Sequence, residues 1–137
     1  MIWLSGPLHW SSKRQSFTAH SSGEAKIGSV DDCTKALQHI CNILQDLKVF
    51  ELFTNGPIPI HNDNSACVQW SHNMTTKGLR YIQMRENAVR EQVQKGFIEV
   101  KHIAGNQNTA DIYTKEDKDV THFLQCADTL VSDPPII

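Results

Sequence analysis

The sequence predicts an α/β fold in which helices pack on a mixed sheet. Apolar residues recur three and four positions apart from Val30 to Leu47, which is typical of one face of a helix. Ile58 and Ile60 instead alternate with their neighbours, as in a strand. Segments of these two kinds follow one another in the order strand, strand, helix, strand, helix, helix, strand, helix, with a helical end. This mixture indicates an α/β domain.

Each element is justified by its local pattern and by the turn residues beside it. Residues 2–4 and 8–12 read as a hairpin around the turn signal Ser5-Gly6-Pro7. Gly96 and the pair Gly105-Asn106 mark later boundaries. Helices are predicted at about 22–48, 64–72, 80–94, 107–115 and 118–130, strands at 58–61 and 97–103, and a frayed tail from 132.

Size and composition are those of one globular domain. The chain has 137 residues, of which 39% are hydrophobic and 20% charged. No apolar run approaches the ~20 residues that span a bilayer. The opening MIWLSGPLHW has no basic region or long apolar stretch of a signal peptide. We therefore expect an intracellular, cytoplasmic protein without a membrane partner. The four cysteines lack zinc-site spacing and are expected to be small buried thiols: Cys33, Cys41, Cys67 and Cys126.

The charge distribution leaves two interpretations open. The net charge of −2 does not indicate a generally basic nucleic-acid binder. Between Lys77 and Lys101, however, six basic residues face only three glutamates. This stretch can be a solvated helix face. Alternatively, it can form a phosphate-binding surface, for which the candidates are Arg80, Arg85, Arg90 and Lys95.

Three acidic residues stand at predicted helix starts. Ser21 and Glu24 fit a capping box, Asp63 is a suitable N-cap, and the helix dipole would favour Asp111. Each residue therefore has a purely structural explanation. Taken together, carboxylates at strand ends and helix starts can converge at one edge of a sheet. Such oxygen ligands suit Mg²⁺, and two ions about 4 Å apart can stabilise both oxygens of a phosphodiester displacement.

Five sequence blocks point to one family. They are GPLHWSSKRQ at 6–15, AHSSGEAKI at 19–27, NDNSA at 62–66, RYIQMRENAVRE at 80–91 and ADIYTK at 110–115. In this order they resemble the runs G-P-I-S-W-S-S-K-x-Q, A-L-S-S-T-E-A-E-Y, C-D-N-x-x-A, K-H-I-D-I-R-Y-H-F-I-R-E and A-D-I-F-T-K. These runs belong to the ribonuclease H domain that ends the Pol polyprotein of copia-type retrotransposons.

The resemblance implies a fold, a reaction and partners. It implies a ribonuclease H-like mixed sheet flanked by helices over residues 1–116, with 117–137 as a C-terminal helical extension and tail. Glu24, Asp63 and Asp111 match three members of the family's four-carboxylate set, which holds two Mg²⁺ or Mn²⁺ ions. Glu24 and Asp63 would serve the ion on the leaving-group side, and Asp111 the ion that activates water. The implied activity is endonucleolytic hydrolysis of the RNA strand of RNA–DNA hybrids, and the implied partner is the reverse transcriptase portion of the same polyprotein.

Several departures from the family pattern qualify this expectation. The fourth carboxylate sits on an opening strand in the family, but no acidic residue precedes Glu24 here, so the first strand is expected to be missing. Lys26 stands where the family has a second glutamate. The resemblance would allow His102 to act in product release, as a mobile histidine does in many relatives, but its place inside a strand pattern favours a structural role. We therefore expect weak metal binding and an inactive isolated chain. The alternatives are a non-catalytic nucleic-acid-binding module and a retroelement relic without activity.

Overall fold

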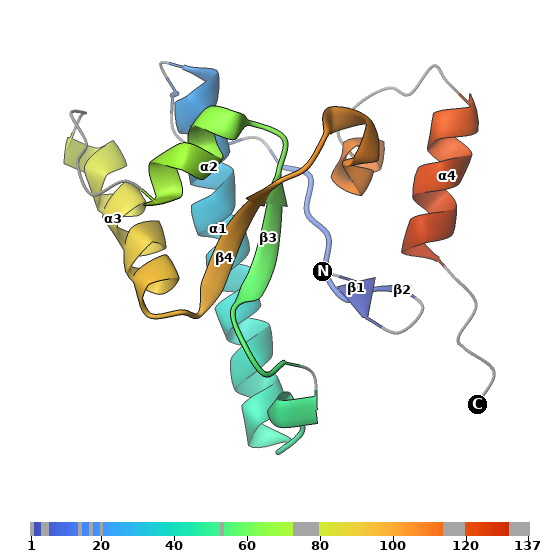
Figure 1. Ribbon diagram of the computed structural model, residues 1–137, viewed down its shortest axis with the longest axis horizontal. Helices are drawn as coiled ribbons and strands as arrows, with labels where there is room; N and C mark the ends of the chain where they lie inside the picture. Colours follow the sequence, from blue (N-terminus) through green and yellow to red (C-terminus); the bar gives the residue numbers. More distant parts are fainter. Residues whose placement is uncertain are drawn as a thin grey trace. The chain divides into compact units, whose positions relative to one another are not determined.

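A computed structural model describes most of the chain (Figure 1). The described residues are 2–3, 6–13, 15–16, 18–19, 21–52, 54–72, 80–113 and 120–131. The chain forms two compact units, one made of Met1–Arg14 with Ala104–Ile137 and the other of Gln15–Ile103. Their placement relative to each other is not determined, so each unit is described by itself.

The larger unit is built around a long helix, α1, at Ser22–Asp46. It begins where the sequence predicts, because the hydroxyl of Ser21 accepts a hydrogen bond from the Glu24 backbone N–H at 3.1 Å. The apolar stripe of α1 is buried at Ile27, Val30, Leu37 and Cys41. The expected amphipathic helix is therefore confirmed, and its stripe supplies one wall of the core.

Two parallel strands pack against this helix. β3 at Ile58–Asn62 pairs with β4 at Ile98–His102, with Ile58 opposite Ile98 and Asn62 opposite His102. Parallel neighbours require a crossover connection. Here α2 at Ser65–His72 and α3 at Arg80–Gln94 supply it (Figure 1). A left-handed Gly96, with φ of 68°, follows α3 and lets the chain turn into β4.

The core of this unit lies between α1, α2, α3 and the two strands. Its most buried hydrophobic side chains are Cys67, Val89 and Ile98, each 1% exposed, and Val30 and Val100, each 2% exposed. Phe50, in a 3₁₀ turn at Phe50–Leu52, packs against the edge of this cluster. Both strands bury one face against the core. Because the two strands run parallel, their carboxyl ends lie at the same rim of the unit.

The smaller unit contains a short hairpin and a helix. β1 at Ile2–Trp3 pairs antiparallel with β2 at Gly6–Pro7. Two 3₁₀ turns, Gly105–Gln107 and Thr109–Tyr113, precede α4 at Val120–Leu130, which packs on the second turn. None of the described helices has the length and apolar character needed to cross a membrane.

The structure corrects three of the predicted elements. A hairpin forms near the N-terminus, but its second strand is Gly6–Pro7, which was predicted to be the turn, and the predicted strand at 8–12 is wrong because these residues lie in no strand and their side chains are exposed. The helix predicted at 107–115 is wrong, because backbone bonds such as Asp111 N–H to the Asn108 carbonyl, at 3.1 Å, span three residues and form 3₁₀ turns. Instead of one mixed sheet, the described residues form two separate two-stranded sheets. The predicted tail from 132 lies outside the described residues.

The fold is thus mixed α/β, as the sequence predicts. The division of the chain at residue 116, which the resemblance implies, stays a prediction.

Candidate functional site

Two of the three predicted acidic residues belong to the larger unit. Asp63 directly follows β3, at the carboxyl end of the parallel pair, and Glu24 lies in the first turn of α1. Asp111 lies in the 3₁₀ turn Thr109–Tyr113 of the smaller unit. Because the two units are not placed relative to each other, convergence of all three carboxylates stays a prediction.

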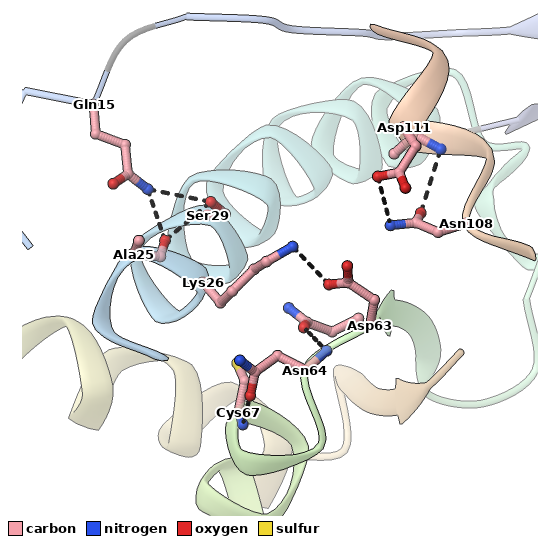
Figure 2. Close-up of polar contacts among 11 residues, drawn as sticks. Gln15, Ala25, Lys26, Ser29, Asp63, Asn64, Cys67, Asn108 and Asp111 are labelled. Atoms are coloured by element: carbon pink, nitrogen blue, oxygen red, sulfur yellow. Dashed lines mark hydrogen bonds and ion pairs between the residues drawn. The ribbon is translucent and has the colours of Figure 1, made fainter. Parts of the chain in front are cut away.

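An ion pair joins the first turns of α1 to the end of β3. The ammonium of Lys26 lies 2.6 Å from Oδ1 of Asp63 (Figure 2). The two side chains are 39% and 20% exposed, so the pair is partly shielded from water. This contact spans 37 residues of sequence and brings the segment that carries Glu24 next to Asp63.

Asp63 does not cap α2, although the sequence analysis identified it as a suitable N-cap. The side chain of Asn64 does so, because its Oδ1 accepts a hydrogen bond from the Cys67 backbone N–H at 3.0 Å. The preceding Asn62 accepts a bond from the Asn64 N–H at 2.9 Å, which holds the turn between β3 and α2 (Figure 2). The carboxylate of Asp63 is directed to Lys26 instead. The prediction of an Asp63 N-cap is therefore wrong.

A buried thiol borders this ion pair. Cys67 is 1% exposed, and burial raises the pKa of its thiol to about 11. The positive charge of Lys26 lowers this pKa, while the negative charge of Asp63 raises it. Cys67 therefore experiences both charges of the pair. The expectation of buried thiols is confirmed for Cys41, Cys67 and Cys126 and is wrong for Cys33, which is exposed.

Gln15 is a site residue that the sequence did not single out. Its amide Nε2 donates to the Ala25 carbonyl at 2.7 Å and lies 3.3 Å from the hydroxyl of Ser29 (Figure 2). These bonds tie the segment before α1 to the helical turn that carries Lys26. The only available signal was its place at the end of the block GPLHWSSKRQ.

Asp111 is held by its own 3₁₀ turn. Nδ2 of Asn108 lies 3.5 Å from the Asp111 carboxylate, and Oδ1 of Asn108 accepts a bond from the Ala110 N–H at 3.3 Å (Figure 2). The expected placement of Asp111 in the first turn of a helical segment is confirmed, although that segment is not an α-helix.

The four predicted nucleic-acid-binding residues differ in their surroundings. Arg90 is only 6% exposed and stacks on the ring of Trp70, 4.7 Å from its centre. Arg85 lies 3.5 Å from both Asp31 and Asp32, with 16% of its side chain exposed.

The remaining two are Lys95 and Arg80. Lys95 is 60% exposed and contacts Glu91 at 2.6 Å. The side chain of Arg80 lies outside the described residues. Two of the four candidates are thus engaged within the fold, and nucleic-acid binding stays a prediction.

The described residues do not assemble a ready metal centre. They contain no group of three or more His, Cys, Asp or Glu side chains placed to hold an ion. His102 ends β4 with an exposed side chain, beside Asn62 in register. At Asp63 the positive charge is supplied by Lys26. Binding of metal ions by Glu24, Asp63 and Asp111 stays a prediction.

Comparison with known proteins shows a similarity in sequence to two of them. No family model and no solved structure matches the chain. It is 29% identical over 109 residues to each of two Arabidopsis thaliana proteins, the Retrovirus-related Pol polyproteins from transposons RE2 and RE1. The match covers 80% of this chain, which spans about 7% of the length of these relatives. The expected resemblance is confirmed at this level: the chain is similar in sequence to the Pol polyproteins of retrotransposons.

Proposed function

We propose that this chain is a ribonuclease H-like module of a copia-type retrotransposon Pol polyprotein, and that it binds RNA–DNA hybrids without cleaving them. The similarity to Pol polyproteins supports the origin. The observation that carries the functional part is the Lys26–Asp63 contact of 2.6 Å. It brings the first turn of α1 to the end of β3, and it puts a cation where the family has a carboxylate.

The position of Asp63 supports a ligand-binding role. In open α/β sheets, ligands bind outside the carboxyl ends of parallel strands. Asp63 lies at this end of the β3–β4 pair and remains 20% exposed, so a ligand can approach it. Glu24 comes from the neighbouring helix start, and Asp111 joins the proposed set through the sequence resemblance alone.

We infer that the chain does not cleave the hybrid because a cation of the chain itself already contacts Asp63. In the family, two Mg²⁺ or Mn²⁺ ions would stabilise the attacking and leaving oxygens. Here one carboxylate of the set already faces an ammonium group. We propose the reverse transcriptase portion of the polyprotein as the neighbouring domain.

Binding and cleavage assays on the same chain test this function. A fluorescein-labelled RNA–DNA hybrid and a DNA duplex of the same sequence are titrated at two salt concentrations and followed by anisotropy. We expect tighter binding to the hybrid, with an affinity that falls as salt rises, since neutralised phosphates release counterions. Gel analysis with Mg²⁺ or Mn²⁺ should show an intact RNA strand.

Two outcomes would contradict the proposal. Equal affinity for hybrid and DNA duplex, or no binding at low salt, would remove the hybrid-binding module. Cleavage that disappears in Asp63→Asn would show an active nuclease and would overturn the non-cleaving part. Lys95→Gln serves as a control, because loss of one exposed phosphate contact should lower the salt slope by about 1 at most.

A further inference from the structure

A partly buried negative charge lies at the end of β3. Asp63 is only 20% exposed and carries a negative charge beside Cys67, which is buried. A partly buried carboxylate requires a compensating cation or hydrogen-bond donors. We propose that the ammonium of Lys26 is that cation, built into the chain, and that it occupies the place on Asp63 which a divalent metal ion would take.

The distances place the two cations in competition for Asp63. Nζ of Lys26 lies 2.6 Å from Oδ1 of Asp63. Mg²⁺ binds oxygen at about 2.0–2.1 Å in a strict octahedron. An ion on the same carboxylate oxygen would therefore lie within a few ångströms of the ammonium, where two positive charges repel strongly. The ammonium of Lys26 balances the charge of the Asp63 carboxylate.

The neighbouring oxygen atoms are also engaged. Oδ1 of Asn62 accepts the Asn64 N–H, and Oδ1 of Asn64 accepts the Cys67 N–H. Both amides hold the turn that begins α2. They are therefore directed to backbone N–H groups, and Asp63 is left as the acidic group of this turn.

The helical turn that carries Lys26 is held by hydrogen bonds to its backbone. Its helix begins at the Ser21 cap, and the Ala25 carbonyl next to it accepts hydrogen bonds from Gln15 at 2.7 Å and from Ser29 at 3.1 Å. The lysine thus projects from an anchored turn. The contact is intramolecular, so the ammonium is available to Asp63 whatever the metal concentration, although the Lys26 side chain gives up rotamer freedom to make it.

Metal titration tests this inference without nucleic acid. Mn²⁺ binding is measured by electron paramagnetic resonance, which reports free Mn²⁺, for the unaltered chain and for Lys26→Gln and Lys26→Glu. We expect no saturable binding by the unaltered chain at submillimolar Mn²⁺. We expect Lys26→Gln to bind more tightly and Lys26→Glu to gain at least tenfold, and addition of Asp63→Asn should abolish that gain.

Lys95→Gln is the matched control. It also removes an ammonium 2.6 Å from a carboxylate, that of Glu91, but on an open helix surface where both side chains are 60% exposed. It should leave Mn²⁺ binding unchanged. If it raises binding as much as Lys26→Gln does, the effect is one of net charge and the inference fails. Equal Mn²⁺ binding by the unaltered chain and both Lys26 variants would also overturn it.

A measurement on the unaltered chain keeps the inference testable if a variant does not fold. Bound Mn²⁺ broadens nearby amide resonances in an NMR spectrum. With Lys26 in place, the amides of Asp63 and Cys67 should stay sharp at submillimolar Mn²⁺, and selective broadening there would refute the inference. The inference depends on the proposed function only for the role of Asp63 in the family. Failure of hybrid binding would leave the metal result intact, and the reverse also holds.

Discussion

Replacement of Arg85 separates a structural role from a nucleic-acid-binding role. On α1, Asp31 is 3% exposed and faces two cations. Lys35, one turn later, contacts it at 2.7 Å and is 63% exposed. Arg85 of α3 lies 3.5 Å away with 16% of its side chain exposed, and it also lies 3.5 Å from Asp32. The same buried carboxylate therefore has one cation in the interior and one in solvent.

The difference in exposure sets the expected magnitudes. Breaking a buried ion pair by removing one partner costs about 3–5 kcal/mol. Arg85→Met leaves Asp31 with Lys35, so we expect roughly half of that loss, about 2 kcal/mol of unfolding free energy. Lys35→Met removes an exposed partner, and exposed pairs contribute only about 0.5 kcal/mol. The longer contact is thus predicted to matter more than the shorter one.

Urea unfolding followed by circular dichroism measures both effects. With a slope of about 1.5 kcal/mol per molar urea, Arg85→Met should lower the midpoint by roughly 1.3 M and Lys35→Met by about 0.3 M. If Lys35→Met costs as much as Arg85→Met, the reasoning from burial is refuted. If Arg85→Met leaves the midpoint unchanged and weakens hybrid binding, Arg85 belongs to a phosphate-binding surface and not to the fold.

Three further predictions concern the same unit. Burial raises the pKa of the Cys67 thiol from 9.0 to about 11. Near pH 8 the fraction of this side chain present as thiolate should therefore be roughly a hundredfold lower in the folded chain than in the unfolded chain. Iodoacetamide should alkylate Cys67 only after unfolding. The pKa of this thiol is higher in the folded chain than in the unfolded chain. The stability that the thiol contributes is therefore complete below pH 9 and is lost as pH rises through 11. Cys67→Ala should remove that alkaline decline in thermal unfolding. Asn64→Ala should cost about 1 kcal/mol of unfolding free energy through loss of the α2 cap. Its control is Leu52→Ala, which alters a side chain that is 79% exposed. This control should lower the unfolding free energy by less than about 0.5 kcal/mol. Equal losses of unfolding free energy in the two variants would contradict the capping role of Asn64. Val100→Ala, at 2% exposure, should cost roughly 2 kcal/mol in the same urea assay, and a loss below about 0.5 kcal/mol would contradict its place in the core.

Local patterns predicted the regular elements of the larger unit well. The apolar stripe and the Ser21 cap predicted a helix at 22–48, and α1 spans Ser22–Asp46. The strand around Ile58 and Ile60 is confirmed as β3, and the glycine stop at Gly96 adopts the left-handed conformation that favours glycine. These features depend on residues a few positions apart, so the sequence contains the information for them.

Predictions failed where two local solutions compete. Residues 8–12 have the composition of a strand, but a strand requires a partner, and within the described part of the chain they pair with no strand. Asp63 and Asn64 are both suitable helix caps, and the path of the chain leaving β3 gives the cap to Asn64. Propensity ranks such alternatives too closely to choose between them.

The sequence by itself determined the helices and the strand segments of the larger unit and the acidic residues at their ends. Only the tertiary structure decided which charges meet. Lys26 reaches an aspartate 37 residues away, and Arg85 of α3 reaches Asp31 and Asp32 of α1. The physical reason is that Coulomb attraction depends on distance in space and on exclusion of water, and both are set by packing. A lysine in a sequence is a positive charge, and its role at the end of β3 exists only once α1 and β3 have packed together.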